Sequence, residues 1–347
     1  MTPKERQLAT IRKQPIDRTP IDAIWIYNQK EIAEYLQIDQ KQVLEELGLD
    51  GRPILLEYKN EFSQRTDSVE AVTWSSTLFE GNSSQYGTLR KYPLEKASTI
   101  RQIESYPWPD PADFNYDRSL ALAEKYGQTY ALRGPFWLPV FCKACDLLGM
   151  EEAMVKMMTE PAIFGAVVER ITDLTAAVCE RYLEVVGDKI DIFEIGDDFA
   201  TQRGLMISPA KWREFIKPQL QRLIDIGKRH DKLIWFHSCG DITDVLPDLI
   251  DMGIDVWETV QLHTLPISPE KLKADYGDHI TFFGGINSQT LPFSSPEAIA
   301  TEVKRVISVL GKNGGYICGP DHTINVDVPP ENTIAMYKTA REVEING

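Results

Sequence analysis

Short hydrophobic runs alternate with longer amphipathic segments through most of the chain, from about residue 129 onward. Runs of four or five residues rich in β-branched and aromatic side chains predict buried strands. These strands are expected at Thr129–Leu132, Ile190–Glu194, Leu233–His237, Asp255–Thr259, Ile280–Phe283 and Gly315–Cys318. An earlier run at Pro20–Ile26 supplies the start of the sheet. Strands that alternate with helical segments are typical of a parallel sheet covered by helices.

The starts of several helices are marked by a serine followed by a proline. Such pairs occur at Ser208-Pro209, Ser268-Pro269 and Ser295-Pro296. The serine side chain can cap the first turn, and proline is well tolerated at the first helical position. The longest predicted helix is Pro161–Val186, whose apolar residues recur every three or four positions.

Polar and glycine-rich groups follow nearly every predicted strand, at Gly134-Pro135, Gly196–Asp198, His237–Asp241, Glu258–Gln261, Gly284–Asn287 and Cys318–His322. Groups that follow so many strands can share one site only if the strand ends form a ring. In an open, doubly wound sheet the outer strand ends would lie too far apart. We therefore predict an α/β fold with one TIM-like (β/α)₈-barrel domain over residues 1–347. N-terminal helical additions and an inserted β-hairpin at about residues 54–93 would extend it.

Composition and charge exclude several classes of protein. The 347 residues are 43% hydrophobic and 26% charged, as in ordinary globular proteins. The net charge of -15, without a compensating cluster of lysine and arginine, argues against nucleic-acid binding. No apolar stretch approaches the roughly 18 residues of a membrane span, and the N-terminus lacks a signal-peptide pattern, so we expect a cytoplasmic protein. Five cysteines are too few for a disulfide framework.

His237, Cys239 and Cys318 form the strongest candidate for a chemical site. His237 ends a predicted strand, and residues two apart on a strand project to the same side, about 7 Å apart at the backbone. An imidazole and a thiol placed in this way can converge on one zinc ion, with Cys318 contributed by the end of another strand. Three protein ligands leave a fourth position open, as in catalytic zinc sites. The alternative is a core histidine with two ordinary buried cysteines.

Other candidates for the site are weaker. Glu258 could be a provisional fourth ligand, or a surface or salt-bridged glutamate. Asp197 and Asp198 could move a proton or orient a metal-bound histidine, although either could instead cap a helix. Asp321 and His322 could belong to the pocket or to a loop, and Gln202 and Asn287 could hydrogen-bond a substrate. Cys142 and Cys145 form a Cys-x-x-Cys pair, for which core packing or surface thiols are expected. The alternatives are a redox pair or half of a metal site.

Motifs spread over essentially the whole chain resemble the uroporphyrinogen decarboxylase superfamily, and within it the zinc-containing, corrinoid-dependent methyltransferases. The matching segments are Glu5-Arg6, Pro15–Pro20, Gly196–Asp198, Ser208-Pro209, Phe236–Gly240, Tyr316–His322 and Pro330–Asn332. In the methyltransferase branch, which includes the methylcobalamin:coenzyme M methyltransferases, a His-x-Cys…Cys pattern holds zinc. The resemblance implies a TIM-like barrel with the ion deep in its mouth and His237, Cys239 and Cys318 as the ligands.

The resemblance also implies a function. A methyl group would move between a small substrate, either a thiol acceptor or a methyl or methoxy donor, and a corrinoid. The sequence contains no cobalamin-binding Asp-x-His-x-x-Gly motif, so a separate corrinoid-binding protein is the expected partner. Alternatives are a decarboxylase or lyase of a small acid, and a metal-dependent regulatory subunit without turnover.

One departure from the family disfavours the decarboxylase. Uroporphyrinogen decarboxylases carry an arginine-rich Arg-Gln-Ala-Gly-Arg segment that grips the carboxylates of the substrate. The corresponding stretch here, Ile24–Gln29, contains no arginine. Carboxylates buried without cationic partners cost several kcal/mol.

Overall fold

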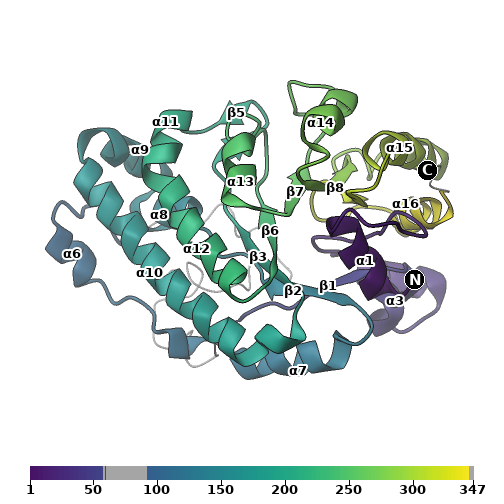
Figure 1. Cartoon of the computed structure of the whole chain (residues 1–347), viewed down its shortest axis with the longest axis horizontal. Helices are drawn as coiled ribbons and strands as arrows, with labels where there is room; N and C mark the ends of the chain where they lie inside the picture. The colour runs from purple at the N-terminus through teal and green to yellow at the C-terminus, as the bar shows by residue number, and fades with distance from the viewer. Residues whose placement is uncertain (58, 60–91, 344–347) are drawn as a thin grey trace.

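The computed structural model describes residues 1–57, 59 and 92–343. Its centre is a curved, parallel seven-stranded sheet with the strand order β1-β2-β3-β6-β7-β8-β9 (Figure 1). The strands are β1 (Gly51–Pro53), β2 (Ala131–Pro135), β3 (Ile192–Gly196), β6 (Leu233–His237), β7 (Val256–Val260), β8 (Thr281–Ile286) and β9 (Tyr316–Pro320). Every neighbouring pair of strands in this sheet is parallel.

The segment Pro20–Asp22 closes the sheet into a barrel. The Asp22 N–H donates to the Cys318 carbonyl (3.1 Å), and the Cys318 N–H donates to the Pro20 carbonyl (2.8 Å), which joins this segment to β9. On its other side the Asp50 N–H donates to the Ile21 carbonyl (2.8 Å), next to β1. The prediction of a TIM-like barrel is confirmed.

The first two strand positions of the barrel differ from the prediction. Pro20–Ile26 takes part through isolated bridges at Ile21 and Ile26 rather than as a continuous strand. The strand β1 was not predicted, because its three residues, Gly51-Arg52-Pro53, show no hydrophobic run. The β6 bounds match the prediction, whereas the other five strands end one to three residues later than predicted. Their glycine-rich and charged ends pair with neighbouring strands although they lack a hydrophobic pattern.

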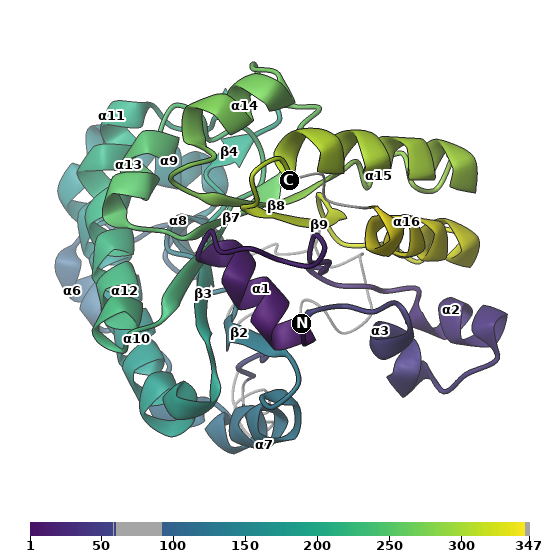
Figure 2. The ribbon, with the colours of Figure 1, turned by 45° about the vertical axis from the view of Figure 1, so that its right-hand side comes forward.

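Helices cover the outside of the sheet (Figure 1). They are α1 (Pro3–Ile11), α2 (Gln29–Leu36), α3 (Val43–Glu46), α6 (Ile100–Glu104), α7 (Tyr116–Tyr126), α8 (Phe141–Leu148), α9 (Met150–Thr159), α10 (Pro161–Val186), α11 (Pro209–Lys211), α12 (Lys217–Arg229), α13 (Leu246–Met252), α14 (Pro269–Tyr276), α15 (Pro296–Leu310) and α16 (Pro330–Glu342). The bounds of α10 match the prediction. The helices α15 and α16 lie side by side (Figure 2), and α15 packs against β8 and β9.

Local sequence explains several of the helix boundaries. Ser208, Ser268 and Ser295 each accept a hydrogen bond from the backbone N–H three residues later, as the serine–proline pairs predicted. A π-helical turn, Trp212–Ile216, joins α11 to α12. A two-stranded ribbon of β4 (Ala200–Thr201) and β5 (Gly204–Leu205) follows β3.

Two apolar cores lie on opposite faces of the sheet. One fills the space between the sheet and the helices. The other fills the inside of the barrel, where Ile192, Trp235, Val256, Phe283 and Ile317 pack together. Because side chains alternate along a strand, neighbouring residues on one strand belong to different cores.

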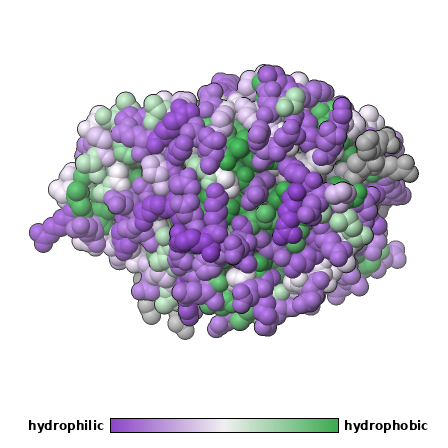
Figure 3. All heavy atoms as spheres, viewed as in Figure 1, coloured by the Kyte–Doolittle hydropathy of each residue, from purple (hydrophilic) through white to green (hydrophobic). Residues whose placement is uncertain are grey.

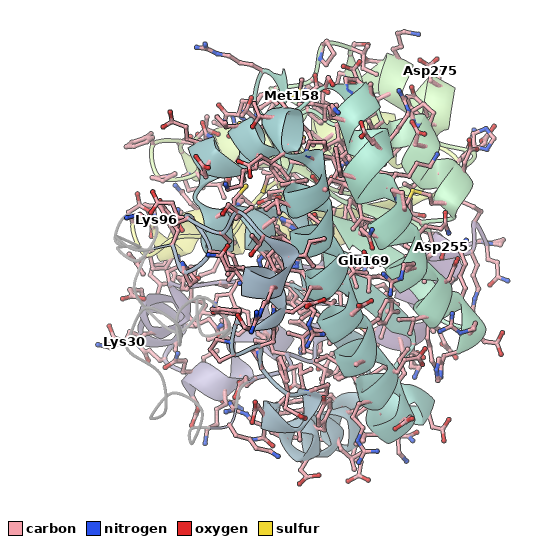
Figure 4. The ribbon with its side chains drawn as sticks, turned by 90° about the vertical axis from the view of Figure 1, so that its left-hand side faces the viewer. Lys30, Lys96, Met158, Glu169, Asp255 and Asp275 are labelled. Carbon is pink, nitrogen blue, oxygen red and sulfur yellow. The ribbon has the colours of Figure 1, made fainter. Side chains whose placement is uncertain are left out.

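Polar residues dominate the outer surface. The face in Figure 3 is largely hydrophilic, with hydrophobic residues in small patches. On the side covered by α10, Glu169 is exposed, and Met158 of α9 is 65% exposed (Figure 4). Within the described ranges, no helix is both long and apolar enough to span a membrane. The hairpin expected at about residues 54–93 falls almost entirely outside the described residues.

Candidate active site

His237 and Cys239 meet at the C-terminal end of β6. The Nε2 atom of His237 lies 3.5 Å from the Sγ atom of Cys239. His237 is the last residue of the strand, and its imidazole is buried at the mouth of the barrel interior. The convergence of these two side chains agrees with the strand periodicity of the sequence.

Asp198 completes a three-residue group with His237 and Cys239. Its Oδ1 atom lies 3.7 Å from His237 Nε2 and accepts a hydrogen bond from the Cys239 N–H (2.7 Å). One potential ligand atom from each residue lies within 4.8 Å of those of the other two. Asp198 comes from the loop after β3, the neighbour of β6 in the sheet, which explains the proximity.

The spacing of these atoms suits zinc. Bond lengths of about 2.1 Å to nitrogen and about 2.3 Å to sulfur put two ligands of a tetrahedral ion roughly 3.5 Å apart. The His237–Cys239 distance of 3.5 Å matches this value, and the His237–Asp198 distance of 3.7 Å is close to it. One nitrogen, one sulfur and one oxygen donor form a ligand set that zinc accepts.

Glu258 holds the other side of the His237 ring. Its Oε1 atom lies 2.8 Å from His237 Nδ1, and its Oε2 atom accepts a hydrogen bond from the Trp235 indole N–H (2.6 Å). Both carboxylate oxygens are therefore engaged away from Nε2, in a position to orient the histidine. Carboxylates in this position fix the tautomer and direction of metal-binding histidines.

Protonation in this group is governed by burial and by close charges. Burial lowers the pKa of His237, but Cys239, Glu258 and Asp198 together raise that pKa well above its usual value. Burial raises the pKa of the Cys239 thiol, and the neighbouring His237 opposes that shift.

Cys318 does not join this group in the structure. It lies in β9 and is 1% exposed, packed in the core between the sheet and the helices. Its neighbour Ile317 faces the barrel interior, so strand alternation turns Cys318 to the opposite face. The predicted convergence of His237, Cys239 and Cys318 is not assembled, and Asp198 stands where the third ligand was expected.

The loop after β9 brings His322 rather than Cys318 to the site. His322 borders the same cavity as His237 and Asp198. Burial and the nearby His237 lower the pKa of its imidazole. Asp321 is fully buried and has a structural role, since it accepts hydrogen bonds from the N–H and hydroxyl of Ser288 (2.9 and 2.7 Å). It thereby ties the loop after β9 to the loop after β8.

Asp197 caps a helix, which was the alternative role considered for it. Its carboxylate accepts hydrogen bonds from the N–H groups of Val140, Phe141 and Cys142 at the start of α8. Burial raises the pKa of Asp197 to about 7, against the lowering effect of these N–H groups. Cys142 hydrogen-bonds the Asp198 carbonyl (3.1 Å), and burial raises the pKa of both Cys142 and Cys145. The raised pKa values favour packing over redox chemistry for this pair.

Gln202 and Asn287 lie farther from the metal-ligand candidates. Gln202 is exposed on the β4–β5 ribbon, at the rim of the site. The Asn287 side chain accepts a hydrogen bond from the Gln289 N–H (3.0 Å) within its own turn. Of the two, Gln202 is the one that borders a cavity together with Cys239.

Two cavities meet at the candidate ligands. An inner cavity of about 510 Å³ of empty space, partly open to solvent, lies against His237, Asp198, Glu194 and Trp137. An outer cavity of about 1290 Å³ of empty space, open to solvent and called the vestibule below, lies against Cys239, Gln261, Ser288 and Gln202. His322 borders both.

Three residues around the inner cavity were not predicted from the sequence: Arg133, Trp137 and Glu194. Arg133 is fully buried and pairs with Asp22 (2.9 Å) and Glu194 (3.2 Å) inside the barrel. The ring of Trp137 stands perpendicular to that of His237, with the ring centres 5.3 Å apart. Glu194 lies at the end of a predicted hydrophobic strand. A charged residue at such a position was the signal in the sequence that could have indicated a site residue.

Comparison with known proteins supports the family resemblance. Residues 95–343 match the family described as uroporphyrinogen decarboxylase (URO-D). The chain is 21% identical over 366 residues to uroporphyrinogen decarboxylase of Pseudomonas fluorescens, with 98% of this chain and 97% of the relative covered. It is 28% identical over 189 residues to that of a Geobacter species, covering 53% of this chain and 50% of the relative.

A solved structure extends the likeness to the fold. A methyltransferase from Methanosarcina mazei superposes with a TM-score of 0.70 at 19% identity, with 99% of both chains covered. At this identity the match shows a shared fold. Together with the match of residues 95–343, which is more than half of the chain, it establishes that the chain belongs to the uroporphyrinogen decarboxylase family.

Proposed function

We propose that this protein is a zinc-dependent methyltransferase that moves a methyl group between a small substrate and a corrinoid carried by a separate protein. The observation that carries the proposal is the group of His237 Nε2, Cys239 Sγ and Asp198 Oδ1 at the barrel mouth. The fold shared with a methyltransferase from Methanosarcina mazei supports it.

In this proposal three residues hold the metal ion and a fourth orients the histidine. His237, Cys239 and Asp198 would hold the ion, and Glu258 keeps the His237 ring turned so that Nε2 faces it. A zinc ion in this place supplies Lewis acidity, which can keep a thiol deprotonated or polarise the leaving group of a methyl donor. The buried indole of Trp235 fixes Glu258 in turn.

The two cavities suit two reactants of different size. The inner cavity, walled by Trp137, Phe136 and Ile24, would take the small substrate. The wider vestibule borders Cys239 from the solvent side and would admit the corrinoid. Bringing both reactants to one point can contribute about 7–11 kcal/mol toward the barrier.

A decarboxylase of polycarboxylate substrates fits the cavities less well. Among the described residues, no lysine or arginine lines the inner cavity, and Arg203 is the one that lines the vestibule. Glu194 and Asp198 line the inner cavity instead. Carboxylates of a substrate would meet carboxylates of the protein and be repelled.

The visible spectrum of the corrinoid tests the proposal. The zinc-loaded protein is mixed anaerobically with methylcobalamin and a panel of thiols, and separately with reduced cobalamin and a panel of methyl donors. Corrinoid proteins from the same cell are added in a parallel series. We expect demethylation in the first mixture or methylation in the second, at a rate lowered at least 100-fold by Cys239→Ala.

Lys312→Gln, on a surface pocket remote from His237 and Cys239, is the matched control and should keep the full rate. An unchanged spectrum in every mixture would remove the methyltransferase proposal. Efficient decarboxylation of uroporphyrinogen by the same preparation would replace it with the activity named for the relatives.

A further inference from the structure

The inner cavity contains a buried carboxylate that has no function in holding the proposed metal. Glu194 lies on the inner face of β3, is 1% exposed, and lines the cavity. Its Oε1 atom accepts no hydrogen bond from any residue that the structure describes. Its Oε2 atom lies 3.2 Å from Arg133 Nε, at an angle that forms no hydrogen bond.

Arg133 cannot satisfy this carboxylate alone. Its guanidinium also donates to Asp22 (2.9 Å) and to the Ala23 carbonyl (2.7 Å), so its charge is shared between two carboxylates. A buried acceptor without a donor costs about 1–3 kcal/mol, and more when it is charged. A ligand that donates to Glu194 would remove that cost.

The rest of the cavity is both acidic and aromatic. In a zinc-loaded site, the Cys239 thiolate and the Asp198 carboxylate would offset the two charges of the ion. Glu194 is then the other carboxylate that lines the cavity among the described residues. Phe136 and Trp137 line the same space, together with the apolar residue Ile24. Aromatic faces with a nearby carboxylate are how proteins bind methylated ammonium ions.

We propose that the small substrate of the inner cavity is an N-methylated ammonium ion that still carries at least one N–H group. The N–H group donates to Glu194, and the methyl groups contact Trp137 and Phe136. This inference rests on the proposed function for the fate of the methyl group, but the binding itself does not depend on it. Burial raises the pKa of Glu194, and a bound cation favours its ionised form.

The chemistry of transfer from such a donor balances. The C–N bond breaks with its electron pair left on nitrogen, so trimethylammonium leaves as neutral dimethylamine. The methyl carbon accepts the electron pair of the reduced corrinoid supplied by the partner protein. No further oxidant or reductant takes part in this step.

Three probes of similar size test the inference by ligand-observed NMR titration of the zinc-loaded protein at pH 8. They are trimethylammonium, uncharged tert-butanol with the same three methyl groups, and anionic methanesulfonate. We expect trimethylammonium to bind at least tenfold more tightly than either of the others. Equal binding of tert-butanol, or tighter binding of methanesulfonate, would overturn the inference.

Two variants locate the site. Glu194→Gln keeps the side-chain shape and should weaken trimethylammonium binding at least tenfold, whereas Trp137→Leu keeps an apolar wall and should weaken it about fivefold. Lys312→Gln, remote from the cavity, should leave binding unchanged. Circular dichroism and zinc content confirm that each variant is folded and loaded. Unchanged trimethylammonium binding in both cavity variants would show that the cation binds elsewhere and would contradict the inference.

The same titration separates this inference from the proposed function. Binding of trimethylammonium in the inner cavity without any change of the corrinoid spectrum would leave the inference standing and remove the methyltransferase. Methyl transfer from an uncharged or anionic donor, with no binding of trimethylammonium, would support the methyltransferase and contradict the inference.

Discussion

At the scale of single residues, two carboxylates with several candidate roles lie on opposite sides of the His237 ring. Glu258 was expected as a possible fourth ligand or as a surface or salt-bridged glutamate, and it pairs with the Nδ1 side of the ring, 2.8 Å away. Asp198 was a candidate for proton transfer, for orienting a metal-bound histidine or for capping a helix, and it lies beside Nε2 and Cys239. The positions of Glu258 and Asp198 in the sequence do not tell which ring nitrogen of His237 each carboxylate approaches.

The two cysteines of the predicted zinc site give a sharp test of this arrangement. Because Cys239 lies in the ligand group and Cys318 faces the outer core, Cys239→Ala should lose zinc while Cys318→Ala keeps about one zinc per chain. Elemental analysis of protein purified without chelators measures both. Zinc loss in Cys318→Ala, with the fold intact by circular dichroism, would restore the ligand set predicted from the sequence.

Glu258 should affect zinc through His237 alone. Glu258→Gln keeps the shape but removes the charge that orients the ring, so zinc affinity should fall roughly 10–100-fold. Competition with a chromogenic chelator gives the affinity. An affinity within twofold of the unchanged protein would show that Glu258 has no part in holding the histidine.

At the scale of elements, local sequence set the helix starts. Ser295 accepts the Ala298 N–H at the start of α15, and Pro296 occupies the first helical position. The same arrangement occurs at Ser208 and Ser268, so these three boundaries could be predicted without tertiary contacts.

The cap of α15 should contribute measurably to stability. Ser295→Ala removes the acceptor of an otherwise unpaired N–H and should lower the free energy of unfolding by about 1 kcal/mol. Urea denaturation measures the difference. Ser308→Ala is the matched control on the same helix, where an exposed serine bonds only the Arg305 carbonyl, and should change stability by less than about 0.5 kcal/mol. Equal effects of the two substitutions would contradict the capping role.

At the scale of the whole molecule, a buried carboxylate holds the barrel closed. Asp50 is fully buried and pairs with Arg6 of α1 (2.7 Å) and with Arg18 (2.9 Å). It also accepts the Ile21 N–H (2.8 Å), next to the place where Pro20–Asp22 bridges β9 and β1. Asp50 therefore joins three segments at the seam of the barrel.

Removal of this carboxylate should be costly. Asp50→Ala removes the buried carboxylate that Arg6, Arg18 and the Ile21 N–H share, so the free energy of unfolding should fall by roughly 3–5 kcal/mol. Asp173→Ala, which breaks an exposed pair with Arg222, serves as control and should cost at most about 1 kcal/mol. Comparable denaturation midpoints for the two variants would rule out a special role for the seam.

The sequence by itself determined the class of fold, most of the strands, the long helix α10 and the pairing of His237 with Cys239. These features depend on the period of hydrophobic residues and on neighbours two to four positions away, which a single strand or helix already fixes. The strand β1, which was not predicted, has too few residues to show a period. It is defined by its pairing with β2, which is distant in the sequence.

Only the tertiary structure decided which distant residues join the site. Strand alternation in β9 turns Cys318 to the outer core, while the loop beyond that strand carries His322 to the cavity. Asp198, Glu258 and Glu194 acquire their roles from neighbouring strands, because β3, β6 and β7 lie in register. Which side chains meet across strands depends on register and on the facing of each residue, and these are set when the barrel closes.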